Sequence, residues 1–232
     1  MLAVVQRMTI RNLLLLTLTA SAALAFETPV MISDVVTGAA SHVRITNTSR
    51  QPVTAWSLAA TTEPSAGRTH REVYTTDGYL SEITHGLPRA AAQLERLLPG
   101  ESRELVLDPL PDGAKVHVIA AVLDDGTAVG DEAVLASIFE TRAKERDALK
   151  AVADTFNAVL PVMHGAEALA ALKDRFAALA DRDDTVPCRV ALDAVRAYPP
   201  DAAADRIDTS LRDYAAFVMR EYELAAKHAQ RR

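Results

Sequence analysis

The sequence predicts an α+β protein in which an antiparallel β-sandwich is followed by a C-terminal helical region packed on the sheet. Up to about Gly130, short apolar runs alternate with turn residues, which is typical of antiparallel strands. From Asp131 onward, apolar residues recur at intervals of three and four, as they do on one face of a helix. The chain has 232 residues, enough for two units that each bury a core. We therefore expect a β-sandwich domain at 26–130 and an α-helical region at 131–232.

The N-terminus has the three parts of a secretory signal peptide. Arg7 and Arg11 are followed by an apolar run at 13–24, and Ala23-Leu24-Ala25 fits the small-x-small rule for cleavage. The predicted signal peptide therefore covers residues 1–25. The expected location of the mature chain is outside the cytoplasm, either periplasmic or secreted.

Two alternatives to this signal stay open. Translation could start at Met8, because the segment that follows is a compact signal by itself. The segment could also be retained as a membrane anchor, although a span needs about 20 apolar residues and this run is shorter. After cleavage we expect no stable membrane insertion. The predicted cut has no cysteine, so a lipid-modified cysteine is not expected.

The most distinct predicted strands form a β-hairpin at 43–60. Val43 and Ile45 alternate with polar residues, the segment 47–52 has turn chemistry, and a second apolar run contains Trp56. We expect Trp56 to be a core residue of the sandwich, with an exposed aromatic face that includes Tyr74 and Tyr79 as the alternative. Other strands are predicted at 30–37, 71–75, 102–107, 114–123 and 127–129.

The run at 114–123 is apolar at nearly every position after Lys115 and His117, which predicts a central strand covered on both faces. Alternation places Val116, Val118 and Val122 against the opposing sheet. The same alternation leaves Ile119 and Leu123 for the helix that follows.

A short helix is predicted at 87–98, and four longer ones follow Asp131. The first runs to Leu160, and its charged middle, 142–147, is expected to face away from the core or to extend beyond the sandwich. The next is centred on 169–179, after a break at Gly165. The last two are predicted at 189–198 and 205–227.

Three segments resemble immunoglobulin-like domains of exported bacterial proteins of unassigned function. They are ITNTSRQPVTAWSLA, LPGESRELVL and VIAAVLDDGTAVGDEAVL. The resemblance covers about the first half of the mature chain and implies an immunoglobulin-like sandwich. No cysteine pair brackets Trp56, so the disulfide-pinned antibody type is excluded. The resemblance transfers no functional residue.

No motif in the sequence assigns a catalytic, cofactor-binding or metal-ligating residue, and we expect no cofactor. The lone Cys188 has no histidine among its sequence neighbours and is expected to be a buried apolar residue. GxSxG and phosphate-binding glycine loops are absent. The histidines show no HxH, HxxxH or HExxH spacing; they are His42, His70, His85, His117, His164 and His228.

The formal charge of −6 argues against a nucleic-acid surface, because phosphate binding needs clustered Lys and Arg. Frequent Ala, Arg and Asp are typical of a bacterium with GC-rich codons. The sequence therefore favours a non-enzymatic binding or scaffolding protein of the cell envelope. The expected partner is another envelope protein, and a homodimer stays open. The alternative is an enzyme or metal-binding protein with a site at the junction of sandwich and helices, formed by His70, His85, Asp77 and Tyr79.

Overall fold

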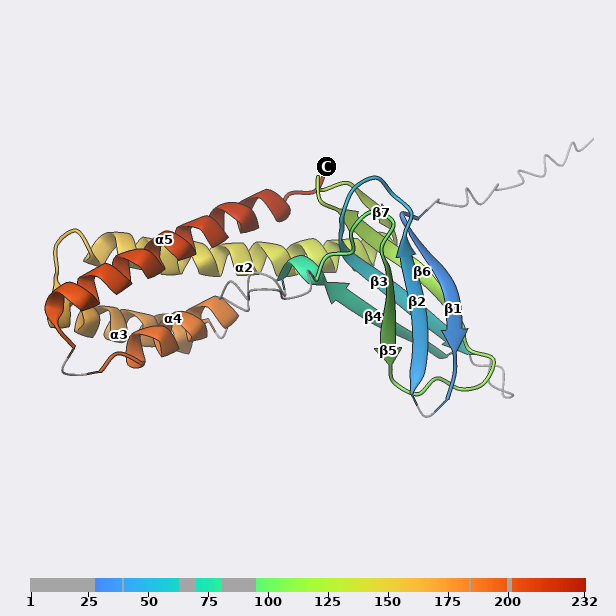
Figure 1. Ribbon diagram of the computed structural model, residues 1–232, viewed down its shortest axis with the longest axis horizontal. Helices are drawn as coiled ribbons and strands as arrows, with labels where there is room; N and C mark the ends of the chain where they lie inside the picture. The colour runs from blue at the N-terminus through green and yellow to red at the C-terminus, as the bar shows by residue number, and fades with distance from the viewer. Residues whose placement is uncertain (1–27, 39, 63–69, 81–94, 184, 200–201) are drawn as a thin grey trace, which may run out of the picture.

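The computed structural model describes residues 28–38, 40–62, 70–80, 95–183, 185–199 and 202–232 (Figure 1). The strands are β1 Val30–Val36, β2 Ser41–Asn47, β3 Val53–Thr62, β4 His70–Asp77, β5 Ser102–Leu107, β6 Lys115–Leu123 and β7 Ala128–Gly130. The helices are α2 Glu132–Val159, α3 Gly165–Arg182, α4 Val186–Arg196 and α5 Ala204–His228. Within these residues, no helix has both the length and the apolar content that crossing a bilayer requires.

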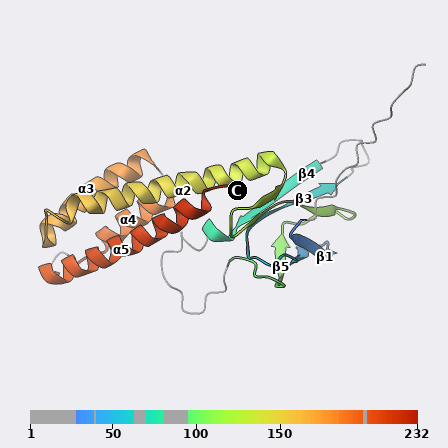
Figure 2. The ribbon, with the colours of Figure 1, turned by 90° about the horizontal axis from the view of Figure 1, so that it is seen from above.

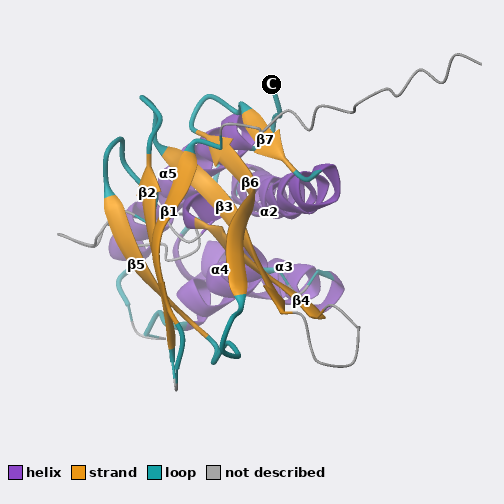
Figure 3. Ribbon diagram, turned by 90° about the vertical axis from the view of Figure 1, so that its right-hand side faces the viewer, coloured by secondary structure: helices purple, strands orange, loops and turns teal. Residues whose placement is uncertain are grey.

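The strands form two antiparallel sheets, with the orders β1-β2-β5 and β4-β3-β6-β7. Figure 3 shows both sheets from the sandwich end, with the helices behind them. Trp56 is 1% exposed and packs between the sheets with Val43, Ile45 and Leu58. The α+β class and the position of Trp56 in the core are therefore confirmed.

The predicted hairpin at 43–60 is wrong, because β2 and β3 belong to different sheets. The segment between them turns a corner of the sandwich. The Asn47 side chain organises this corner, where its amide donates to the carbonyl oxygens of Gln51 at 2.8 Å and Leu97 at 2.9 Å. The Asn47 amide thus provides hydrogen bonds to backbone carbonyl groups at the corner, although β2 and β3 on either side of it do not pair with each other.

The predicted alternation along β6 is correct in its first half and inverted in its second half. Val116 and Val118 face the opposing sheet, as expected, but Val122 faces α2 and Leu123 faces the sheet. The register of β6 against β3 shifts where Leu58 pairs with Val118 and the preceding residue of β3 pairs with Ala120. One extra residue at such a bulge exchanges the two faces of a strand.

The helical predictions hold for the four long helices, with corrections at their ends. The predicted break is confirmed, because α2 ends at Val159 and α3 begins at Gly165. Pro187 lies in the first turn of α4 and not in the connection before it, since the backbone N–H that proline lacks has no partner within a helix at this position. Of the helix predicted at 87–98, residues 87–94 lie outside the described residues. The described remainder is not helical, since Leu97 forms a β-bridge with Val53.

Only the start of α2 packs on the sheet, where Leu135 and Ile138 contact Ala55 and Ala120. The rest of the helical region extends away from the sandwich and buries its own core (Figure 2). The predicted packing of the whole region on the sheet is therefore corrected. The last helix returns toward the sandwich, and the backbone N–H of Arg232 donates to the carbonyl oxygen of Gly126 at 3.1 Å.

Candidate functional site

Two charged residues of α2 are buried in the part of the helix that we expected to be exposed. Arg142 is 1% exposed and Glu145 is 8% exposed. They continue the buried stripe of the helix at spacings of three and four, between Ile138 and Leu149. The expectation that the segment 142–147 faces away from the core is therefore wrong for these two positions, whereas the alternative, that the helix extends beyond the sandwich, agrees with the structure (Figure 2). Each of them marks a different region of the molecule.

Arg142 lies where the sandwich meets the helices. Its Nε donates to Oδ2 of Asp77 at 2.7 Å, and its Nη2 donates to Oδ1 of the same carboxylate at 3.0 Å. Nη2 also donates to Oγ1 of Thr54 at 3.1 Å, and Nη1 donates to the backbone oxygen of His228 at 3.2 Å. One guanidinium thus ties together β3, the end of β4 and the end of α5. A bidentate pair of this kind fixes geometry as well as charge.

The surroundings of Arg142 are aromatic and charged. The Tyr79 ring lies 5.4 Å from the guanidinium carbon and 4.3 Å from the His228 ring, measured to the ring centroids. Nε2 of His228 lies 3.8 Å from Asp124, which also pairs with Arg96 and Lys227. Burial lowers the pKa of His228, while the nearby carboxylate of Asp124 acts in the opposite direction. The junction is therefore a polar network whose charges have partners.

Of the residues that we grouped into a junction site, Asp77 and Tyr79 lie together beside Arg142, whereas His70 lies apart from them. His70 and Asp77 stand at opposite ends of β4, about 23 Å apart at the usual rise of a strand. Tyr79 is 3% exposed and belongs to the helical core, and His85 lies outside the described residues. Nowhere in the described ranges do three His, Cys, Asp or Glu side chains gather as metal ligands.

Glu145 lies one turn beyond Arg142, in a different environment. Its Oε1 has no hydrogen-bond partner among the described residues. Burial, and then the charge of Asp183 where α3 ends, raises its pKa to about 7 from the ordinary value of 4.5. A buried carboxyl without a donor is costly, and native proteins rarely keep one without a purpose. Glu145 is the functional candidate that the sequence reasoning missed.

Glu145 is one of the residues that line a cavity of about 30 Å³ between α2, α4 and α5. The other lining is almost entirely apolar, with Glu221 of α5 as the second acid; it includes Leu149, Val152, Pro187, Val190, Tyr214 and Val218. The cavity is partly open to solvent, and Val190 at its mouth is 38% exposed.

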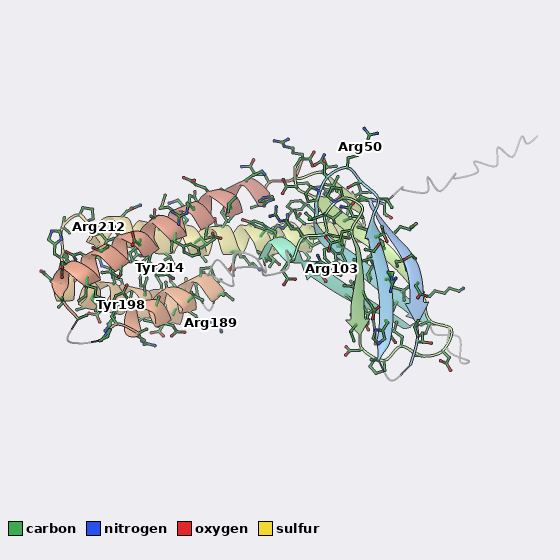
Figure 4. The ribbon with its side chains drawn as sticks, in the orientation of Figure 1. Arg50, Arg103, Arg189, Tyr198, Arg212 and Tyr214 are labelled. Atoms are coloured by element: carbon green, nitrogen blue, oxygen red, sulfur yellow. The ribbon has the colours of Figure 1, made fainter. Side chains whose placement is uncertain are left out.

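A second and larger cavity, of about 500 Å³, lies where α4 ends and α5 begins, and its lining includes described residues of the connection between them. It is lined mainly by small residues and carries Arg206 at its rim; the lining includes Ala194, Ala197, Tyr198, Ala202, Ala203 and Ile207. Both α4 and α5 pack mainly on α2 and α3 and make little contact with each other. We call these two separate cavities together the α4–α5 groove. Figure 4 labels Tyr214, which lies on α5, and Tyr198, which follows the end of α4.

Several other candidates are structural. Cys188 is 1% exposed, and burial raises the pKa of its thiol, so the expectation of a buried apolar residue is confirmed. Asp131, which precedes α2, caps this helix by accepting from the backbone N–H groups of Ala133 and Val134. Tyr74 packs on the sandwich core, so the alternative of an exposed aromatic face is wrong for Trp56 and Tyr79 and unsupported for Tyr74.

Comparisons of this chain with protein-family models, with curated proteins and with solved structures find no match.

Proposed function

We propose that this chain is a non-enzymatic binding protein of the bacterial cell envelope that receives one amphipathic helix of a partner protein in the α4–α5 groove. The observation that carries the proposal is the groove itself. It comprises one cavity between α2, α4 and α5 and another where α4 ends and α5 begins, and these two helices pack on α2 and α3 but scarcely on each other. In bundles, this is where another helix would complete the core.

The size and lining of the groove suit a helix. It extends along α4 from Val186 to Tyr198, about 18 Å at the rise of an α-helix, which matches a partner helix of about twelve residues. The alanines Ala194, Ala197 and Ala203 leave room for another backbone to approach closely. An apolar face of a partner helix, with anchors every three or four residues, would fill such a groove.

The charges at the two ends of the groove favour one orientation of the partner. Glu145 and Glu221 lie at one end, and Arg206 lies at the other. A helix carries about half a positive charge at its N-terminus and about half a negative charge at its C-terminus. The N-terminus of the partner helix therefore lies at the acidic end.

The rest of the molecule supports a role in presenting this groove. The strand orders β1-β2-β5 and β4-β3-β6-β7 are compatible with an immunoglobulin-like sandwich, a fold that commonly serves in extracytoplasmic recognition. The buried Arg142 network holds the sandwich to the helices in one geometry. The basic and apolar N-terminal segment supports export of the chain.

Site-specific photo-crosslinking in the cells that produce the protein tests this function. A benzophenone amino acid replaces Ala197 or Val190 in the groove, and Ala170, which is exposed on α3 outside the groove, serves as the control. We expect a discrete protein adduct from both groove positions and none from Ala170. Peptide mapping should place the crosslink in an amphipathic helical segment, and the synthetic segment should bind the purified chain. Equal adducts from all three positions, or crosslinks to a non-helical segment, would overturn the proposal.

A further inference from the structure

The acidic end of the groove has the features of a site for a specific side chain. Glu145 is more than nine-tenths buried, lies on the floor of the groove and has an oxygen without a hydrogen-bond donor among the described residues. The stripe on α2 would accept an apolar residue at this position, as it does at Leu149 and Val152. A carboxyl group retained there is explained by a donor that arrives with the ligand.

We propose that the pocket at Glu145 receives a lysine side chain of the partner helix, whose ammonium group pairs with the Glu145 carboxylate. This inference rests on the proposed function and adds the chemistry of one contact. The apolar lining from Leu149, Val152 and Val190 suits the four-carbon stem of lysine. The Glu145 carboxylate provides the charge that complements its end.

The volume of the pocket selects lysine over arginine. The enclosed part of the cavity, about 30 Å³, holds roughly one water molecule, so it has room for an ammonium group while the four-carbon stem lies along the open mouth at Val190. The planar guanidinium of arginine, with its five donors, is larger. The narrow end of the groove therefore admits a compact cation on a flexible stem.

The ionisable groups around the pocket make the pairing depend on pH. Asp183 faces Glu145 from the end of α3, Cys188 from α4, and Tyr214 and Glu221 from α5. The acids favour a bound cation, and the Glu145 carboxyl must be ionised to form the pair. Binding of the cation should therefore strengthen from pH 5.5 to pH 8.5, by more than tenfold if Glu145 titrates near neutrality.

The test uses n-butylammonium chloride, which is the lysine side chain without its backbone, added to the full mature chain. Methyl NMR signals of Val152, Val190 and Val218 report binding, with n-butanol and n-propylguanidinium as neutral and larger probes. We expect saturable shifts with butylammonium and binding at least about tenfold weaker for the other two probes. Glu145→Gln should lose this preference, whereas Glu167→Gln, an exposed change on α3, should keep it.

Equal binding of butylammonium and butanol to the wild type, or unchanged butylammonium binding in Glu145→Gln, would overturn the lysine contact. The methyl spectrum itself shows whether each variant is folded. Glu145→Met is a second variant that lacks the carboxyl group. This test needs no partner, so its failure is separate from failure of the crosslinking test. Butylammonium binding combined with absent groove crosslinks would overturn the partner lysine and leave a site for small amines.

Discussion

Arg142 and Glu145 stand one turn apart on α2 and are both buried, but only Arg142 has its charge satisfied. The guanidinium donates four hydrogen bonds to Asp77, Thr54 and His228. The Glu145 carboxyl has an oxygen without a partner among the described residues, and its pKa rises to about 7. A buried ion with full partners is a structural element, whereas one without them is a cost to the folded state that a ligand can remove.

The difference follows from what each turn of α2 meets. At Arg142 the helix lies against the sandwich, where β4 ends in Asp77 and α5 ends in His228. At Glu145 the neighbours are α4 and α5, whose facing residues are mainly apolar. The same helix thus joins two modules at one turn and forms the floor of a groove at the next.

Loss of the Arg142 side chain should produce the largest effect. In Arg142→Met, the side chain of Asp77, which is 10% exposed in the wild type, loses its ionic partner, and the free energy of unfolding should fall by about 3–5 kcal/mol. Urea denaturation of the mature chain measures this change. Arg146→Met removes a half-exposed pair with Asp147 one turn later and should cost less than about 1 kcal/mol. An equal fall in the free energy of unfolding of the two variants would contradict the structural role that we assign to the buried Arg142.

Glu145 should make stability fall as the pH rises. Its pKa is higher in the folded chain than the ordinary 4.5, so the folded state holds an extra proton between about pH 4.5 and pH 7. Stability is therefore greatest below pH 4.5 for this group and decreases through pH 7, by roughly 2 kcal/mol after allowance for solvent at the pocket mouth. Urea titrations from pH 4.5 to pH 8 should show this decrease in Glu167→Gln and not in Glu145→Gln. A decrease that persists in Glu145→Gln would assign it to another group.

His228 should make the stability of the folded state fall as the pH falls. Burial lowers its pKa, so the unfolded chain binds the proton more readily and the folded state loses stability as the pH falls through the ordinary value of 6.5. His228→Gln should show a smaller loss than the wild type between pH 7.5 and pH 5.5 by the same urea measurement. A larger loss in the variant would mean that Asp124 stabilises the charged imidazole more than burial disfavours it.

Filling the groove should have the smallest effect on stability and a large one on binding. Ala197→Trp places a large side chain in the wide cavity at an exposed position, and unfolding should change by less than about 0.5 kcal/mol. The groove crosslink from Val190 should disappear in this variant and persist in Ala170→Trp. Retention of the crosslink in Ala197→Trp would place the partner elsewhere.

Periodicity alone predicted most of the strands and the four long helices. β5 matches its predicted range of 102–107, and the change from strands to helices falls at Asp131, which caps α2. The hairpin prediction failed because turn residues indicate that the chain changes direction but do not indicate which sheet the next strand joins. The predicted facing of side chains in the second half of β6 is wrong because a bulge changes no sequence pattern in a run that is apolar throughout.

The sequence contains a signal that could have identified Arg142 and Glu145 as buried residues. The apolar stripe on α2 is interrupted between Ile138 and Leu149, and Arg142 and Glu145 fill the gap at the same spacing of three and four. We assigned charged residues to the surface without asking where the helical period places them. The partners of Arg142 come from residues 54, 77 and 228, a combination that only the tertiary structure provides.

The ionisation of Glu145 in the folded protein tests the contrast with Arg142 most directly. Carboxyl ¹³C NMR of the mature chain, with Glu145 assigned through loss of its signal in Glu145→Gln, follows this group from pH 4 to pH 9. A midpoint of about 7 is the result that our account predicts, because the carboxyl is buried and lacks a donor. A midpoint near 4.5 would contradict it, since the carboxylate would then be solvated or paired within the chain and would have no need of a ligand's cation.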